Sequence, residues 1–456
     1  MPKHSIVILI DHKGRDLMGA ALIAHHLEKM GHRVYLEPVE AFKAVINAWK
    51  PSIVIVNHIG HSNIADYTAQ LKKWGILVGV LLNEGLCLED SDRQFLSKPQ
   101  FDNVHCDLFL SWNVPHTEAL IEHQFVTPTE NTITVGCPRF DYYKSPWSQV
   151  FLKDKANAPK NKNDDKINLL LNTTFAVAHY FHRSEKDQIK LYESLGEGEV
   201  ENTDDYKLLI KAHYDGLQKI PAFLTPILES LEYNIIIRPH PREELSFYQD
   251  FIDGLPVEQK LLIRIDKKTP IQSAILCSDI ILNCEDCTTS VESWISKRPT
   301  LTLTFAKHPL FFTQLYAERS PLVDEPEDLM PALKHALENP DQEGYRRLRD
   351  DYLKKWLYKL DGRSSERAAE AIHKTLQDKN PQPKYPKGFT HTRRALKLRL
   401  LNLFNEPSHA KLSQIIRRKL NKFNENLTLR DRNYLKAVTP KEAREAIDLV
   451  KSVTPE

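Results

Sequence analysis

A histidine held between two prolines follows a buried strand in the second half of the chain. Arg238, Pro239, His240 and Pro241 come directly after the apolar run 235–237. The prolines restrict the backbone and help to aim the imidazole. A cation and a titratable histidine at a strand end suit a phosphate or diphosphate leaving group, to which His240 can donate a hydrogen bond or a proton. The alternative is a turn whose histidine caps the next helix.

A second polar segment, residues 284–292, follows the apolar run 280–282 and is expected to open a helix. Three hydroxyl side chains would lie at its N-terminus: Thr288, Thr289 and Ser290. Hydroxyls and backbone N–H groups there can bind phosphate, and Glu292, further into the helix, can bind ribose hydroxyls. The alternative is an ordinary threonine cap with a glutamate near the third helical position.

A glutamate ends a strand in the first half of the chain. Asn83, Glu84 and Gly85 follow the apolar run 76–82. A carboxylate at a strand end, beside a glycine that lets substrate approach, can act as general base on an acceptor hydroxyl. The alternative is a turn glutamate in a salt bridge.

Two further loops follow expected strands. Arg139 and Asp141 come after the last strand of the first half, where they can orient the domains or touch a ligand, with a structural role favoured. Thr173 and Thr174 come after the first strand of the second half, where a loop can reach a nucleotide.

Short apolar runs alternate with amphipathic stretches along most of the chain, which predicts parallel sheets covered by helices on both faces. We expect an α/β protein with two Rossmann-like domains facing across a cleft. Residues 1–152 would form an acceptor domain and 167–380 a nucleotide-donor domain, joined by a polar linker at 153–166. Ligands of open α/β sheets bind outside the carboxyl ends of the strands, so the loops above take priority.

Composition narrows the class of protein. The chain has 456 residues, 41% apolar content and a net charge of +1, which points to no partner by itself. Six scattered cysteines argue for a reducing compartment, and the Cys284–Cys287 spacing has no second pair that would complete a zinc site. No apolar run reaches the roughly 20 residues of a membrane span. We therefore expect a cytoplasmic protein without a bound metal.

Residues 381–456 form a basic helical extension. Eleven lysines and arginines and one acid, Glu406, lie between residues 384 and 422. Helical spacing places four apolar side chains on one face: Leu396, Leu400, Leu403 and Phe404. Such a helix can lie on the anionic inner leaflet of a membrane or dock on an assembly partner, or it can pack on its own chain. Nucleic-acid binding is not expected, because the extension has little aromatic interleaving and the remainder is not basic.

The order of these motifs resembles the bacterial surface carbohydrate biosynthesis protein family over about residues 1–310. The matching segments read NEGL, DLFLSW, GCPRFD, LNTTF, RPHPRE, CTTSVES and SKRP, at residues 83–86, 107–112, 136–141, 171–175, 238–243, 287–293 and 296–299. The pattern is more distantly similar to GT-B sialyltransferases and Kdo transferases that use CMP-sugars, and to CDP-glycerol glycerophosphotransferases. Asn83 and Cys137 depart from it, replacing an acid and an asparagine.

The resemblance implies a GT-B glycosyltransferase of surface polysaccharide synthesis. Glu84 would be the base, His240 would contact the nucleotide phosphate, and Thr288 and Thr289 would bind phosphate. A retaining reaction with a carboxylate nucleophile is the alternative to base catalysis. The favoured donor is a CMP-linked Kdo or nonulosonate and the acceptor is a glycan or lipid-linked glycan, with no cofactor. The alternatives are a CDP-polyol phosphotransferase and a non-catalytic assembly scaffold of the same fold.

Overall fold

The computed structural model describes residues 3–58, 62–82, 104–124, 129–152, 165–189, 203–285, 288–305, 318–407, 409–419 and 429–454. The chain forms two compact units, each described by itself. Unit 1 combines Met1–Val150 with Lys354–Glu456, and unit 2 is Phe151–Leu353. Most of the expected linker, residues 153–164, lies outside the described residues.

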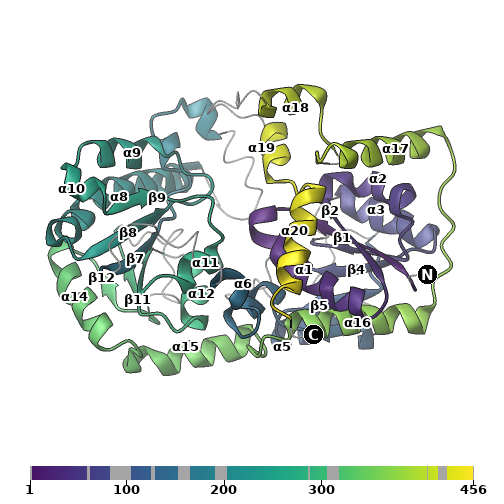
Figure 1. The fold of residues 1–456 in the computed structure, drawn as a ribbon, viewed down its shortest axis with the longest axis horizontal. Coiled ribbons are helices and arrows are strands. Elements are labelled where there is room, and N and C mark those ends of the chain that lie inside the picture. The colour runs from purple at the N-terminus through teal and green to yellow at the C-terminus, as the bar shows by residue number, and fades with distance from the viewer. Residues whose placement is uncertain are drawn as a thin grey trace. The chain divides into compact units, whose positions relative to one another are not determined.

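Unit 1 contains a parallel sheet of six strands in the order β2-β1-β3-β4-β5-β6 (Figure 1). The strands are β1 (Ser5–Ile10), β2 (Arg33–Pro38), β3 (Ile53–Val56), β4 (Leu77–Leu81), β5 (Leu108–Ser111) and β6 (Thr132–Thr134). Central strands such as β3 are buried along their whole length, as their unbroken apolar sequences predict. The strand order reverses between β1 and β3, which marks the ligand crevice of a doubly wound sheet.

Helices from both ends of the sequence cover this sheet. Those from the first half are α1 (Lys13–Lys29), α2 (Phe42–Trp49), α3 (Ser62–Lys73), α5 (Val114–Glu122) and the short η3 (Pro138–Tyr143). Those from the C-terminal part are α16 (Ser364–Lys379), α17 (Phe389–Leu403), α18 (Leu412–Lys419), α19 (Leu429–Lys436) and α20 (Pro440–Lys451). In Figure 1, α17 runs beside α2 and α20 crosses α1. The basic extension therefore packs on its own chain.

Unit 2 contains a second parallel sheet, in the order β12-β11-β10-β7-β8-β9. Its strands are β7 (Ile167–Asn172), β8 (Tyr233–Arg238), β9 (Ile263–Ile265), β10 (Ile280–Cys284), β11 (Thr300–Leu303) and β12 (Leu322–Val323). This is the strand order of dinucleotide-binding domains, and it reverses between β7 and β10. The expected pair of Rossmann-like sheets is confirmed.

The helices of unit 2 are α8 (Thr203–Ser230), α9 (Ser246–Asp253), α10 (Val257–Lys260), α11 (Ile271–Leu276), α12 (Thr289–Ile295), α14 (Pro326–Glu338) and α15 (Glu343–Trp356), whose end enters unit 1. A proline inside a helical stretch predicts a break, but α8 continues through Pro221 and Pro226. The apolar face of this helix, including Phe223 and Ile227, is buried in the core of unit 2. That packing outweighs the local cost of a helical proline, about 3 kcal/mol.

The expected end of the second domain at residue 380 also differs from the structure. Residues 354–380 belong to unit 1, where α16 packs against α1 and η3. Three residues of its buried face are Ala368, Ala369 and Ile372. Because these contacts join segments more than 200 residues apart, helical spacing alone could not assign α16 to either unit. Among the described residues, no helix is both long and apolar enough to cross a membrane.

Candidate functional site

The register of the second sheet aligns three polar side chains at the carboxyl ends of neighbouring strands. Asn172 of β7 pairs with Asn283 of β10 on one side and with Arg238 of β8 on the other. Three apolar residues directly precede each of them, and each lies in one of the last two positions of its strand. This row spans the β7/β10 reversal, the position where doubly wound sheets bind ligands.

A buried polar cluster occupies the reversal itself. The Nδ2 of Asn172 and the Oγ1 of Thr289 both donate to the Oδ1 of Asn283, each at 2.9 Å. Within the described part of the chain, the Oδ1 of Asn172, the Nδ2 of Asn283 and the Oγ of Ser290 have no hydrogen-bond partner. Buried polar groups are normally paired, so unpaired groups gathered at one strand end mark a candidate functional position.

The hydroxyl side chains at the start of α12 differ in exposure and in hydrogen bonding. Thr288 is exposed, and its side chain makes no capping hydrogen bond, so the simple N-cap alternative is not realised. Thr289 commits its proton to Asn283, and would have to release that bond before it could donate to a phosphate. Ser290 and Glu292 are buried. Thr288 is therefore the most accessible of the four expected ligand contacts.

His240 is half-buried in the loop after β8. Its Nδ1 accepts a hydrogen bond from the backbone N–H of Arg242 at 3.2 Å, which places the proton of the neutral ring on Nε2. Burial lowers the pKa of His240 to about 4, with further lowering from Arg242 and Lys267. At neutral pH the imidazole is therefore an uncharged Nε2–H donor. Pro241, beside it, is exposed.

Two cationic side chains, Arg242 and Lys267, lie close enough to His240 to lower its pKa. Arg242 is exposed, and Lys267 follows β9 and donates to the carbonyl of Glu243 at 2.7 Å. Arg238 donates to the carbonyl of Thr269 and so braces the loop after β9. Positive charge near a neutral imidazole favours an anionic ligand at this edge.

Glu243 links the loops after β7 and β8. Its carboxylate accepts from the backbone N–H groups of His240 and Phe175, at 2.9 and 3.0 Å, and from the hydroxyls of Thr173 and Tyr248. Burial raises the pKa of Glu243, and these donors oppose that shift. Thr173 is thus a structural contact in this structure, since its hydroxyl bonds to Glu243. The neighbouring Thr174 is half-buried.

A hollow of about 510 Å³ adjoins Glu243. Its other walls include His179, Arg183, Tyr214 and Phe247, from the loop after β7, α8 and α9. Pockets for small ligands and cofactors commonly measure about 300–1,000 Å³ and have apolar and aromatic walls with a few polar groups. The hollow therefore has the size and chemistry for a compact organic ligand.

Glu285 lies just beyond β10 in a conformation that a glutamate rarely adopts. Its φ is +47°, its side chain is 0% exposed, and its Oε1 accepts from the backbone N–H of Phe305 at 2.6 Å. Left-handed backbone at a non-glycine residue is a form of strain that clusters at functional loops. Glu285 therefore links the end of β10 to Phe305, which follows β11.

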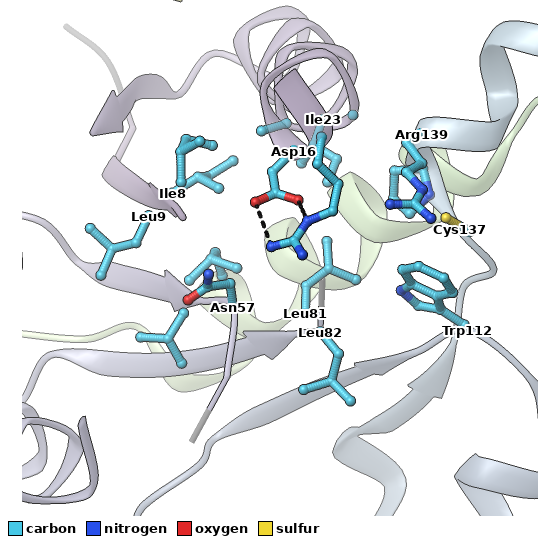
Figure 2. Close-up of a pocket in the computed structure, with 17 residues that line it drawn as sticks. Ile8, Leu9, Asp16, Ile23, Asn57, Leu81, Leu82, Trp112, Cys137 and Arg139 are labelled. Carbon is cyan, nitrogen blue, oxygen red and sulfur yellow. Dashed lines mark hydrogen bonds and ion pairs between the residues drawn. The ribbon is translucent and has the colours of Figure 1, made fainter. Parts of the chain in front are cut away.

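Unit 1 has a small cavity at the carboxyl edge of its own sheet, about 60 Å³ in volume (Figure 2). Its walls come from the ends of β1, β3 and β4, from α1 and from the segment around Cys137. Arg139 lies over the rings of Trp112 and Phe140, with its guanidinium carbon 5.5 and 5.0 Å from their centres. Asn57 is 5% exposed, and neither polar atom of its amide has a partner among the described residues.

Asp141 has a structural role within unit 1. Its carboxylate accepts from the backbone N–H groups of Ser364 and Ser365, at 3.0 and 2.7 Å, and from the Ser365 hydroxyl at 2.7 Å. It thus caps the N-terminus of α16 from a distant segment. Only 2% of the residue is exposed, so its carboxylate is committed to α16 in this structure.

Asn83, Glu84 and Gly85 lie outside the described residues, so the position of the expected base is not described. The loop after β1 is described and lies under the extension. Asp11 pairs with Lys436 of α19 at 2.6 Å, and Lys13 pairs with Glu442 of α20 at 2.6 Å.

Several residues at these edges were not expected from the sequence as site residues. They are Asn57, Lys267, Asn283 and Glu285, together with the linking role of Glu243. A polar residue that ends an apolar strand was the available signal for Asn57 and Asn283. No set of three or more histidine, cysteine or acidic side chains in the described ranges is arranged to hold a metal.

No protein-family model matches the sequence, and no curated protein matches it. Solved structures with similar folds include an S. aureus MnaA–UDP complex, with 13% identity, 85% of this chain and 100% of that chain covered, and a TM-score of 0.50. A Listeria monocytogenes putative UDP-N-acetylglucosamine 2-epimerase is 15% identical, with 84% of this chain and 99% of that chain covered and a TM-score of 0.50. A variant of the wall teichoic acid polymerase TagF is 14% identical, with 83% of this chain and 90% of that chain covered and a TM-score of 0.50. These likenesses confirm the expected two-domain α/β fold of GT-B type.

Proposed function

We propose that this protein transfers a sugar from a nucleotide-activated donor to an acceptor during synthesis of a bacterial surface glycan. The observation that carries the proposal is His240, a neutral Nε2–H donor that lies near Arg242 and Lys267 at the carboxyl edge of the second sheet. A phosphate group offers only acceptor oxygens and negative charge, which matches this environment.

The donor would lie along the carboxyl ends of β8, β7 and β10. Its phosphate would accept from His240 and from the exposed hydroxyl of Thr288, while Arg238 and Lys267 supply positive charge. The hollow beside Glu243 has room for the nucleoside, and Tyr214 and Phe247 offer aromatic surface. The motif resemblance favours a CMP-linked Kdo or nonulosonate as the donor. UDP-linked sugars are further candidate donors, because UDP is bound in the MnaA structure.

In the transfer, the acceptor hydroxyl oxygen forms a bond to the anomeric carbon as the bond from that carbon to the phosphate oxygen breaks. Glu84 would take the hydroxyl proton. The nucleotide leaves as an anion, and the Nε2–H of His240 stabilises the charge developing on the departing oxygen. The chain's own groups would handle this charge without a cofactor.

The first unit would bind the acceptor glycan. The cavity beside Asn57 offers an unpaired amide and an apolar wall, and Arg139 and Trp112 present a cation and a ring at its margin. Sugars have polar edges and apolar faces, which suit an amide beside an aromatic ring.

A CDP-polyol phosphotransferase is the second candidate, favoured by the fold likeness to the teichoic acid polymerase TagF. It would use His240 in the same position but transfer a phosphopolyol group. A non-catalytic assembly scaffold of the same fold is the third, and activity assays separate it from the others.

Transfer and donor hydrolysis should be measured with CMP-sugars, UDP-sugars and CDP-glycerol, for the unmodified protein and its His240→Ala and His240→Gln variants. We expect His240→Ala to lower kcat/KM by about 10²–10⁴-fold. Glutamine retains a terminal N–H donor, so His240→Gln should recover part of that loss. His335→Ala, an exposed histidine of α14, is the matched control. Full activity in His240→Ala would disprove the role of His240, and inactivity with every donor would favour the scaffold.

A further inference from the structure

Helix α17 has apolar side chains on two opposite faces. One face carries Ala395, Leu398 and Leu401, which are buried. This face packs against α2, and Arg399 adds a hydrogen bond to the carbonyl of Ala48 at 2.7 Å. The contact with unit 1 therefore fixes the orientation of α17 and determines which side chains point away from the protein.

The opposite face is apolar and exposed. It carries Phe389, Leu396, Leu400, Leu403 and Phe404, and Phe389 and Leu403 are 82% and 83% exposed. At about 100° of rotation per residue, these five side chains fall within an arc of roughly 100° centred away from the buried face. An apolar strip of this kind on a helix already anchored by its other side marks an interaction surface.

The charge around this strip is positive. Arg393, Arg394 and Lys397 are exposed on the same helix. Glu406, the only acid between residues 384 and 422, is 5% exposed and binds Arg418 and Tyr434, so it does not neutralise the surface. Among the described residues 384–407 and 409–419, cations border this apolar strip and no acid is exposed. Such a surface is complementary to one that carries anionic groups above an apolar layer.

Helix α18 continues the same chemistry. Leu412 and Ile416 are exposed, and Lys411, Arg418 and Lys419 are exposed beside them. Figure 1 shows α17 and α18 along one side of unit 1. Exposed apolar and cationic side chains are thus found on both helices, α17 and α18.

We propose that the exposed face of α17, extended by α18, docks on a bilayer that contains anionic lipid. The apolar side chains enter the boundary between headgroups and acyl chains, and the lysines and arginines bind lipid phosphates. This inference rests on the extension alone and does not depend on the donor chemistry proposed above. It would hold unit 1 at the surface where lipid-linked acceptors lie.

The test is co-sedimentation of the full chain with vesicles of phosphatidylcholine alone or of phosphatidylcholine with phosphatidylglycerol. We expect binding to the anionic vesicles that weakens as salt is added. Leu400→Ser with Leu403→Ser should lower partitioning by at least tenfold. Arg393→Gln with Lys397→Gln should lower it by roughly fivefold per charge and reduce its salt dependence.

Unit 2 provides matched controls. Val257→Ser with Leu261→Ser removes two exposed apolar side chains, and Arg346→Gln with Arg347→Gln removes two exposed charges. Neither pair should change vesicle binding, and all four variants should keep the unfolding transition of the unmodified protein. Equal binding to both vesicle types, or unchanged binding of the α17 variants, would overturn the proposal. Self-association that the leucine substitutions abolish, without vesicle binding, would instead identify an interface between copies.

Discussion

Replacing Glu243 tests whether one buried carboxylate holds together the two loops of the proposed donor site. Its Oε1 accepts from the backbone N–H groups of Phe175 and His240, and its Oε2 accepts from Tyr248. Alanine would leave both backbone donors without an acceptor, and each buried, unsatisfied donor costs about 1–3 kcal/mol. The N–H of half-buried His240 can partly turn to water, so its loss should cost less than the maximum. We therefore expect Glu243→Ala to lower the free energy of unfolding by about 3–5 kcal/mol in total.

Glutamine is the matched comparison. Its Oε1 can still accept from Phe175 and His240, and its amide can meet a reoriented Tyr248 hydroxyl, so the loss should be only about 1 kcal/mol. Urea unfolding gives both values, and hydrogen exchange locates them at the amides of Phe175 and His240. Protection should persist in Glu243→Gln and disappear in Glu243→Ala. Equal destabilisation by both variants, or continued protection in Glu243→Ala, would refute the linking role of Glu243.

Three further predictions concern stability and binding. Asp141→Ala should lower the free energy of unfolding by about 2–4 kcal/mol in urea, because α16 loses its cap and the amides of Ser364 and Ser365 lose a buried acceptor; an unchanged midpoint would contradict this. Thr289→Ala should lower the free energy of unfolding by about 1 kcal/mol, because it removes the hydrogen bond to Asn283. Thr288→Ala should leave stability unchanged and weaken nucleotide binding, since its side chain makes no capping bond. Urea unfolding and calorimetric titration measure the two effects, and the reverse pattern would reject these roles for Thr288 and Thr289. The free energy of unfolding should fall as pH drops from about 6.5 to about 4. Four histidines have folded-state pKa values lowered to about 4, whereas histidines of the unfolded chain protonate near 6.5, so protonation in this window favours the unfolded chain. Equal urea midpoints at pH 6.5 and pH 4 would count against this prediction. These histidines are His25, His32, His240 and His409.

Local sequence patterns predicted the elements well. Runs such as that of β3 are apolar throughout because parallel strands are buried on both faces, and this periodicity is visible without any contact information. The same applies to the apolar strip of α17. Leu396, Leu400 and Leu403 share a face by spacing alone, and the structure shows that this face is exposed.

Long-range contacts could not be predicted in this way. The alignment of Asn172 with Asn283 depends on the register between strands more than 100 residues apart, and no local pattern specifies that register. Asp141 appeared beside Arg139 as a candidate cleft residue, but its partners are the distant Ser364 and Ser365. Helices and strands are determined largely by residues close in sequence, whereas the candidate site depends on which strand ends lie next to each other in the folded sheet.

The most direct test of the proposed donor site is NMR of the protein labelled with ¹⁵N-histidine, with His240 assigned from the spectrum of His240→Gln. Spectra would be recorded at pH 7 during addition of CMP, CDP, UDP and GDP. We predict a neutral His240 ring with its proton on Nε2, and a saturable shift of that signal with at least one nucleotide while the His335 signal stays unchanged. A proton on Nδ1, or a His240 signal that responds to none of the nucleotides, would contradict it.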